Sequence, residues 1–469
     1  MKFKRQTQYR TNRSMLACAL ASCMLISAPH ALAQSTGATI RGQVSADSAP
    51  AAGATVTATN TATGLTRKVQ SAANGGYFLG GLPPGTYRVD VTANGKTNTQ
   101  NITVQVGQTA TLNLGVGGVA ETAPTGEATN LETVSVTATA AVETKTSEVA
   151  TYVTQRQIQA LPQASRNFLA FADTVPGMVF ETRGNNTTQL KSGAQSANGV
   201  NVYIDGVGQK SYTLAGGIGG QTQSQGNPFP QLAIGEYKVI TSNYKAEYDQ
   251  ISSAAVTAVT KSGTNEFHGD VFMDINGVRG WRSATPIEKG QGFKNETMEK
   301  QYGAALGGPI IQDKLFFFVT YEGKDFSRPR TVRLEGNADP TLVTPELASY
   351  YSTVSTPFNE DLWFGKLTWQ AGDEHLVELT MKRRRETDVA DIGSGPNSAS
   401  YGKSINNDSD RYDLRYQFST ENWLNDMHLT YEDDSFNPIA LTTTENGREI
   451  SSWLEGSSSP RGVYLRYGG

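Results

Sequence analysis

Cysteine is almost missing from this chain, which has 2 among 469 residues, at positions 18 and 23. Long apolar runs are missing after the N-terminus, where no stretch reaches the ~18 consecutive apolar residues of a transmembrane helix. An excess of basic charge is missing too, since 40 Lys and Arg face 44 Asp and Glu. The sequence therefore excludes a helical membrane protein and offers nothing for a nucleic-acid partner.

Residues 1–33 have the three parts of a secretory signal. A positive region without acidic residues comes first, made of Lys2, Lys4, Arg5, Arg10 and Arg13. An apolar region follows from Met15 to Ala28, and small residues at 31 and 33 predict cleavage between Ala33 and Gln34. The alternative, a lipoprotein box at residues 20–23, would leave only a few apolar residues before it.

Cleavage removes both cysteines, so the mature chain has no thiol, disulfide or Cys-ligated metal. Loss of five cations takes the formal net charge from −4 to −9. With 48 Gly, 19 Tyr and 17 Phe, the chain favours strands and turns. An acidic, β-rich, secreted chain of this kind suits the periplasm or the outer membrane.

Residues 34–116 predict a β-sandwich of about seven strands. Short β-branched runs recur about every ten residues, separated by turn signals such as Asn74-Gly75, Pro83-Pro84-Gly85 and Asn94-Gly95. Residues 117–145 then predict a linker rich in Ala and Thr. Within it, residues 131–138 alternate apolar and polar like a lone strand.

Residues 146–265 predict an α+β domain. Thr154 and Ser165 are candidate N-caps of two short helices, the second ending near Pro176-Gly177. The run from Val200 to Ile204 followed by Asp205-Gly206 predicts a tight hairpin, because Asp tolerates and Gly favours the positive φ of a type I′ turn.

Residues 266–469 predict longer strands that alternate strictly. Trp363, Leu367 and Trp369 share one face, and Lys366 and Thr368 the other. An apolar face opposite a charged face over ~10 residues is typical of a transmembrane β-barrel with a wet lumen, although a soluble sheet alternates as well. Since these residues supply roughly eight strands, we expect the barrel to be incomplete, with further strands missing.

The order of these parts resembles the TonB-dependent outer-membrane receptors of the Oar-like group. The sandwich resembles the carboxypeptidase regulatory-like domain, through Gly76-Tyr77-Phe78 and the run from Leu82 to Val89. The remaining resemblance is carried by residues 203–207, 244–248, 259–265, 307–311 and 313–318.

This resemblance implies a mainly β fold, with an α+β plug at 146–265 and the first barrel strands at 266–469. It also implies plug motifs that hold the domain together or contact the barrel wall, at Asp205, Gly206, Pro176, Gly177, Arg183 and Gly184. The segment that engages TonB, called the TonB box, would be Glu132, Thr133, Val134, Ser135, Val136, Thr137 and Ala138. The alternative for this segment is plain linker.

The partners implied are the TonB energy-coupling complex, outer-membrane lipid and lipopolysaccharide, and an unknown extracellular ligand: a siderophore, oligosaccharide, peptide or protein. The N-terminal domains would lie on the periplasmic side. No cofactor, metal, nucleic acid or catalytic residue is expected. The function implied is ligand transport through a plugged barrel. The alternative is a surface adhesion protein that binds carbohydrate or protein without transport.

Three further motifs have less specific interpretations. His375 and Glu378 spell a zinc-peptidase motif, but residues three apart in a strand point to opposite faces and cannot share a metal. Residues 216–220 are glycine-rich but lack the spacing of a phosphate-binding loop. The basic run 382–385 predicts a solvated rim at a strand end, or alternatively a surface for lipopolysaccharide phosphates or an anionic ligand.

Overall fold

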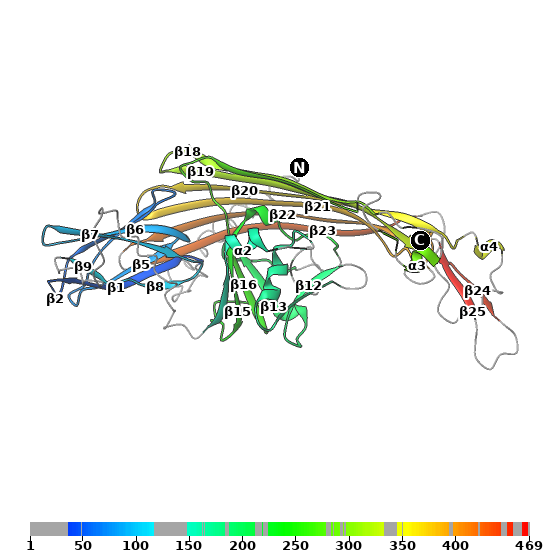
Figure 1. The fold of residues 1–469 in the computed structure, drawn as a ribbon, viewed down its shortest axis with the longest axis horizontal. Coiled ribbons are helices and arrows are strands. Elements are labelled where there is room, and N and C mark those ends of the chain that lie inside the picture. Colours follow the sequence, from blue (N-terminus) through cyan, green and yellow to red (C-terminus); the bar gives the residue numbers. More distant parts are fainter. Residues whose placement is uncertain are drawn as a thin grey trace, which may run out of the picture.

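The computed structural model describes residues 36–47, 49–116, 148–161, 163, 165–182, 187–211, 218, 224–277, 283–284, 286–290, 294, 297–332, 345–348, 350–393, 397–420, 423–441, 448–453 and 462–467. Within these ranges no helix is both long and apolar enough to cross a membrane. Most of the described residues form three parts, which we call the sandwich, the inner domain and the wall sheet (Figure 1).

The sandwich consists of two sheets packed face to face, drawn in blue in Figure 1. Their strands are β1 (Ala38–Ala46), β2 (Ala49–Pro50), β3 (Thr55–Asn60), β4 (Thr66–Gln70), β5 (Gly76–Leu82), β6 (Gly85–Ala93), β7 (Lys96–Val104), β8 (Thr109–Thr111) and β9 (Leu114–Val116). One sheet has the order β4-β3-β6-β7, and in the other β1 pairs with β2, β5, β8 and β9. Alternate residues such as Ile40, Val56 and Val89 are fully buried between them. The predicted sandwich is confirmed, with more short strands than expected.

The inner domain, residues 148–263, is built on a mixed sheet of order β10-β15-β16-β13-β14. Its elements are β10 (Val149–Val153), α2 (Gln155–Ala160), η1 (Phe168–Thr174), β11 (Met178–Thr182), β12 (Thr188–Ser192), η2 (Ala197–Gly199), β13 (Val200–Ile204), β14 (Val207–Gly208), η3 (Gln231–Ala233), β15 (Ile234–Ser242) and β16 (Ala254–Thr260). Apolar residues of β13, β15 and β16 form one core with those of η1.

Two helix starts were predicted in this domain, and one prediction needs correction. Thr154 caps α2 in a reciprocal capping box with Gln157, as predicted. The second helix is a 3-10 helix whose N-cap is Asn167, not Ser165. The Oδ1 of Asn167 accepts a hydrogen bond from the N–H of Leu169 at 3.1 Å. This later start brings Phe168 and Leu169 into the core.

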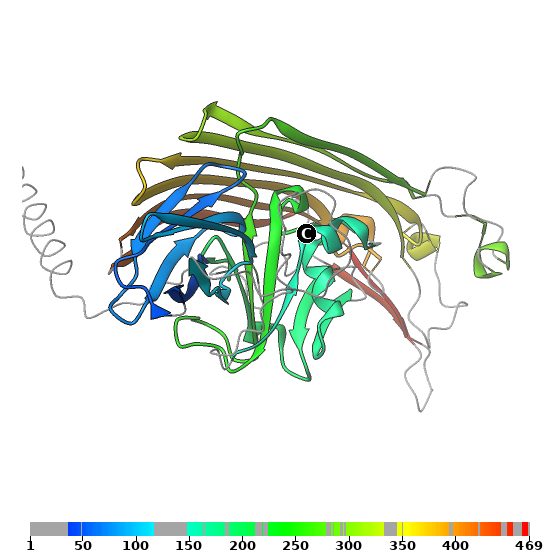
Figure 2. The same ribbon diagram turned by 60° about the vertical axis from the view of Figure 1, so that its left-hand side comes forward.

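The wall sheet is an antiparallel meander of seven strands that arches over the inner domain (Figures 1 and 2). Its strands are β17 (His268–Asn276), β18 (Glu299–Ile311), β19 (Leu315–Thr331), β20 (Thr353–Gln370), β21 (His375–Ala390), β22 (Lys403–Ser419) and β23 (Leu424–Ala440). From β18 onward they have 13 to 18 residues, so the predicted length of ~10 is wrong. Within the described residues β17 and β23 end the sheet without pairing to each other.

The connections of the wall sheet differ in length at its two ends. Short turns at 312–314, 371–374 and 420–423 alternate with long connections at 277–298, 332–352 and 391–402. The described parts of the long connections include α3 (Pro286–Gly290), α4 (Pro345–Ala348) and η5 (Ala399–Tyr401). A separate hairpin follows, made of β24 (Arg448–Trp453) and β25 (Gly462–Tyr467).

The wall sheet is apolar outside and charged inside. On the outer face Val271 is 85% exposed and Trp369 is 51% exposed, whereas Glu360, Lys366 and Arg384 are buried against the inner domain. Soluble monomers rarely expose a continuous apolar face of this extent, but it is what lipid requires. The predicted alternation of the two faces is confirmed.

Aromatic residues form a row across the outer face. Ring centroids lie 4.4 Å apart for Tyr321 and Trp363, 6.1 Å for Tyr302 and Tyr321, and 6.5 Å for Tyr412 and Tyr431. Amphipathic rings prefer the boundary between lipid tails and water. The long strands therefore continue past this boundary toward the long connections.

Candidate functional site between the inner domain and the wall sheet

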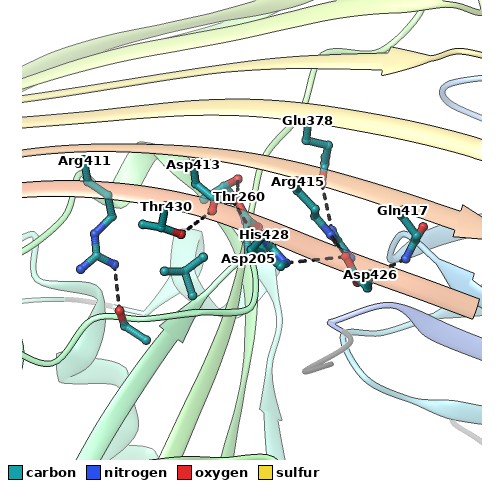
Figure 3. Close-up of polar contacts among 12 residues, drawn as sticks. Asp205, Thr260, Glu378, Arg411, Asp413, Arg415, Gln417, Asp426, His428 and Thr430 are labelled. Atoms are coloured by element: carbon teal, nitrogen blue, oxygen red, sulfur yellow. Dashed lines mark hydrogen bonds and ion pairs between the residues drawn. The ribbon is translucent and has the colours of Figure 1, made fainter. Parts of the chain in front are cut away.

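The tight turn predicted at Asp205-Gly206 is present. Ile204 pairs with Val207 across the antiparallel hairpin of β13 and β14. The two turn residues have φ angles of 50° and 89°, as a type I′ turn requires. The turn lies close to the inner face of the wall sheet (Figure 3).

The carboxylate of Asp205 is buried at 6% exposure and fully engaged. It accepts hydrogen bonds from the N–H of Thr260 at 2.9 Å and from its hydroxyl at 2.5 Å. The Nζ of Lys366, on the wall sheet, lies 3.4 Å from the same carboxylate. A buried charge is costly unless it is paired and hydrogen-bonded, and here both conditions are met.

From Lys366 the contacts continue across four neighbouring wall strands. Lys366 lies 2.9 Å from Glu378, and Glu378 lies 2.9 Å from Arg415. Arg415 then binds both oxygens of Asp426 in a two-pronged contact at 2.7 and 2.6 Å (Figure 3). We call this row the ion chain: Asp205, Lys366, Glu378, Arg415 and Asp426. Its side chains are all less than 10% exposed, so each depends on its neighbours for compensation.

Beside the ion chain, further polar contacts lie on β22 and β23. The Nδ1 of His428 lies 3.0 Å from Asp413, which also accepts from the hydroxyl of Thr430 at 2.6 Å. One strand position further, Arg411 donates to the backbone C=O of Gly208 at 2.8 Å. The turn between β13 and β14 is therefore held by the wall sheet from two sides.

A second contact between the inner domain and the wall sheet involves residues 224–227. The backbone N–H of Asn227 lies 2.9 and 3.0 Å from the two oxygens of Glu360. The guanidinium of Arg384 donates to Ser224 at 2.9 Å and to the C=O of Asn227 at 3.3 Å. Ser224 also donates to Glu386. Charged groups of the wall sheet thus hold this buried segment in place.

The predicted solvated rim at 382–385 is wrong. These residues lie inside β21, so their side chains alternate between the two faces. Arg384 is fully buried and faces Ser224, and Lys382 is buried near the ring of Phe229. Only Arg383 and Arg385 lie on the outer face, where both contact Asp410.

The zinc-peptidase spacing in β21 places its two residues in different surroundings. The ring of His375 stacks on Tyr416 and Phe418, with centroids 6.0 and 5.1 Å away. Glu378 points inward and belongs to the ion chain. Among the described residues, no group of three or more His, Cys, Asp or Glu is arranged to hold a metal ion.

Several predicted site residues lie outside the described residues: Ala33, Gln34, Glu132 to Ala138, Arg183, Gly184 and most of 216–220. Pro176-Gly177 form a turn before β11, where Gly177 has a φ of 88° and its C=O accepts from the N–H of Gly193 at 2.7 Å. Their roles stay predictions.

Most residues of the site escape prediction from the sequence. Lys366 and Arg415 are recognisable there only as members of a polar face, and Glu378 only as part of its spacing with His375. Thr260 lies in a segment that carries the resemblance, but without a role, and Ser224 and Asn227 belong to no motif. A usable signal existed, because charged residues at inward positions of a barrel strand need partners in the lumen.

An antiparallel sheet that is apolar outside and charged inside defines a class, the outer-membrane β-barrel proteins. The family comparisons agree with this class. Residues 39–117 match the carboxypeptidase regulatory-like domain, and residues 259–336 match an outer membrane beta barrel domain. The second match indicates an outer-membrane location, as predicted.

Among curated proteins, the chain is similar to the TonB-dependent transporter Oar of Myxococcus xanthus. The two are 27% identical over 361 residues, which cover 71% of this chain and 32% of that protein. The chain thus spans about a third of the length of this relative. The match confirms the predicted resemblance to TonB-dependent receptors of the Oar-like group.

Two solved structures align with about two thirds of this chain. The outer membrane transporter YddB from Escherichia coli aligns with 68% of this chain and 43% of its own, at 13% identity and a TM-score of 0.46. A mutant of the ferric enterobactin receptor PfeA from Pseudomonas aeruginosa aligns with 67% of this chain and 43% of its own, at 14% identity and a TM-score of 0.42.

Proposed function

We propose that this chain is part of an outer-membrane transporter that moves a ligand through a plugged barrel with energy from the TonB complex. The inner domain would be the plug, and the wall sheet part of the barrel around it. The observation that carries this proposal is the ion chain, which ties the turn at Asp205 to four strands of the wall sheet.

The chemistry of these contacts suits a closure that must open. Charged groups that leave one another can be rehydrated as water enters the lumen, whereas an apolar core would be exposed at a cost of ~25 cal/mol per Å². Breaking one buried pair costs about 3–5 kcal/mol when nothing replaces the partner. The closure is therefore stable at rest, yet work applied by a partner can open it.

The point where a pull would act is the linker before β10. Residues 132–138 alternate like a strand and can offer backbone groups for strand addition by TonB. β10 is an edge strand that pairs only with β15 among the described strands. A pull on the linker would therefore reach this edge of the inner domain first.

The lengths of the connections support one direction of the chain in the membrane. Outer-membrane barrels have short turns on the periplasmic side and long loops outside. The short turns at 312–314, 371–374 and 420–423 would then face the periplasm. The sandwich contacts these turns, which supports a periplasmic position for it.

A proline substitution in the linker tests the proposal in a full-length protein. Val134→Pro removes a backbone donor and hinders strand addition, and Ala128→Pro is the matched control outside the predicted segment. Labelled ferric siderophores, oligosaccharides and peptides are tested one at a time for surface binding and for internalisation.

For the ligand that binds, we expect Val134→Pro to abolish internalisation while surface binding and the control variant stay unchanged. Surface binding without any internalisation that depends on TonB would contradict transport and favour the adhesion alternative. Internalisation that survives Val134→Pro but still requires TonB would place the coupling segment elsewhere in 117–147.

A further inference from the structure

We propose that the sandwich is a releasable cover, which closes the short-turn end of a cavity between the inner domain and the wall sheet. The evidence that the sandwich closes this end of the cavity is the set of contacts that the sandwich makes. Only the force that releases it, a pull on the linker, rests on the proposed function above.

The sandwich is docked on both other parts. At the wall sheet, Arg67 donates to the C=O of Asp373, and the hydroxyl of Ser419 donates to the C=O of Gly80 at 3.2 Å. The N–H of Asn265, just before β17, donates to the C=O of Ala62 at 3.0 Å. At the inner domain, Glu236 accepts from the N–H of Val106 at 2.5 Å.

Beneath these contacts lies a cavity of about 560 Å³. Its walls come from all three parts, and they include Pro84, Thr103, Glu236, Ser262, Lys366 and Arg415. Two of these residues belong to the ion chain. A ligand that passes the opened ion chain would therefore enter a space whose periplasmic end is closed by the sandwich.

The charged groups that become buried when the sandwich docks have few partners, in contrast to those of the ion chain. Arg67 is only 3% exposed, and its Nε and Nη2 have no hydrogen-bond partner. Burial lowers the pKa of Arg67, and it raises the pKa of Glu236 to about 7. Both groups regain contact with water when the sandwich leaves. Their rehydration therefore lowers the free-energy cost of releasing the sandwich.

The linker connects the two docked parts directly. β9 ends at Val116 and β10 begins at Val149, and the predicted TonB-binding residues 132–138 lie between them. A pull on this segment acts on both ends of the linker. It would draw the sandwich off the short turns as well as load the edge of the inner domain.

A single-cysteine reporter tests the closure in the full-length protein. Residues 34–469 contain no cysteine, so Ser262→Cys supplies the one thiol in this part of the protein. Its reaction with a charged methanethiosulfonate reagent is followed by mass spectrometry of its own peptide. Gly64→Asn and Gly81→Asn together are designed to displace the sandwich by crowding its docked surface. A Cβ there would lie 2.3 Å from the side chain of Asp313, in a short turn of the wall sheet, and 2.7 Å from the side chain of Leu424.

The matched control is Gly53→Asn with Gly95→Asn. All four glycines have positive φ, but a Cβ at 53 or 95 meets nothing within 4 Å. We expect labelling of the thiol at position 262 to be about tenfold faster in the displaced variant and unchanged in the control. Equal labelling rates in all three proteins would overturn the closure.

A disulfide provides the second test. An ideal Cβ at position 64 lies 3.4 Å from the Cβ of Asp313, close to the separation in disulfides, so Gly64→Cys with Asp313→Cys can fasten the sandwich to the wall sheet. In cells with an energised TonB complex, the thiol at position 262 should be labelled faster when this disulfide is reduced and stay protected when it is oxidised.

Equally fast labelling with the disulfide closed would overturn the cover. One further outcome would contradict the proposed function but not the cover. If energisation never changes labelling of the reduced protein while the displaced variant is labelled fast, the sandwich is a cover but the pull on the linker is refuted.

Discussion

Both carboxylate oxygens of Asp205 are occupied by one residue, Thr260, which donates its N–H at 2.9 Å and its hydroxyl at 2.5 Å. The contact joins the turn after β13 to the end of β16, its parallel neighbour in the inner domain. Thr260 thereby orients the carboxylate of Asp205, and the Nζ of Lys366 on the wall sheet lies 3.4 Å from it. Asp205 therefore serves the inner domain and the closure at once.

Asp205→Asn should loosen this turn without changing its shape. Asn keeps one acceptor but places an amide where a carboxylate oxygen accepts the Thr260 hydroxyl. We expect the free energy of local opening at β13 to fall by about 1–3 kcal/mol. Hydrogen exchange of β13 amides measures it, with exposed Asp325→Asn as the control. Unchanged protection of β13 would contradict the role of this carboxylate.

Lys366→Met should be more damaging, because it leaves the carboxylates of Asp205 and Glu378 with one cation fewer. We expect a loss of about 3–5 kcal/mol in the stability of the inner domain against the wall sheet. The double variant Lys366→Met with Asp205→Asn should lose less stability than the two single variants lose in sum, by about 0.5–3 kcal/mol. Denaturant titration of the four proteins measures the coupling, and strict additivity would argue against the contact.

Arg384→Gln and Arg383→Gln form a matched pair in β21. Arg384 faces inward and donates to Ser224 and Asn227, whereas Arg383 faces outward and is half exposed. We expect Arg384→Gln to speed hydrogen exchange at 224–227 at least tenfold, since the buried acids Glu360 and Glu386 lose their cation. Arg383→Gln should change little. Equal effects of the two would restore the idea of a solvated basic rim.

Docking of the sandwich should weaken as pH rises. Burial raises the pKa of Glu236 in the docked state to about 7, above its ordinary value near 4.3. Docking is then favoured most below the ordinary value, and this contribution is lost as pH climbs toward 7. Labelling of Ser262→Cys, divided by that of exposed Thr97→Cys at the same pH, should rise several-fold between pH 5 and pH 8.

The variant Glu236→Gln tests whether Glu236, and not another charged group nearby, causes the pH dependence of docking. Lys261, Asp270 and His268 line the same cavity, so a pH effect alone does not identify Glu236. With Gln at 236 we expect protection of the thiol at position 262 to be independent of pH over this range. A pH profile that survives the substitution would show that docking does not depend on Glu236.

Local patterns were predictable where the local chain decides the outcome. The turn at Asp205-Gly206 depends on two φ angles that Asp and Gly adopt readily, and the structure has them. The capping box of Thr154 depends on residues three apart. At the second helix two capping residues compete within three positions, and Asn167 prevails over Ser165 with Phe168 and Leu169 directly after it in the core.

The basic run at 382–385 shows where local reasoning failed. A strand of ~10 residues would end near this run and leave it in water. β21 has 16 residues, so the run lies within the strand and alternates between the outer and inner faces of the wall sheet. Strand length beyond the membrane is decided by pairing with β20 and β22, which the sequence of one strand does not contain.

The sequence by itself determined which residues share a face, because side chains of a strand alternate with period two whatever the strand pairs with. That is why the alternation alone places Trp363, Leu367 and Trp369 together. Only the tertiary structure decided which residues of the inner domain and the sandwich these faces contact. Asp205 and Lys366 lie 161 positions apart, and Arg67 and Asp373 lie 306 apart. No local rule orders such distant groups, since their pairing depends on how the three parts pack.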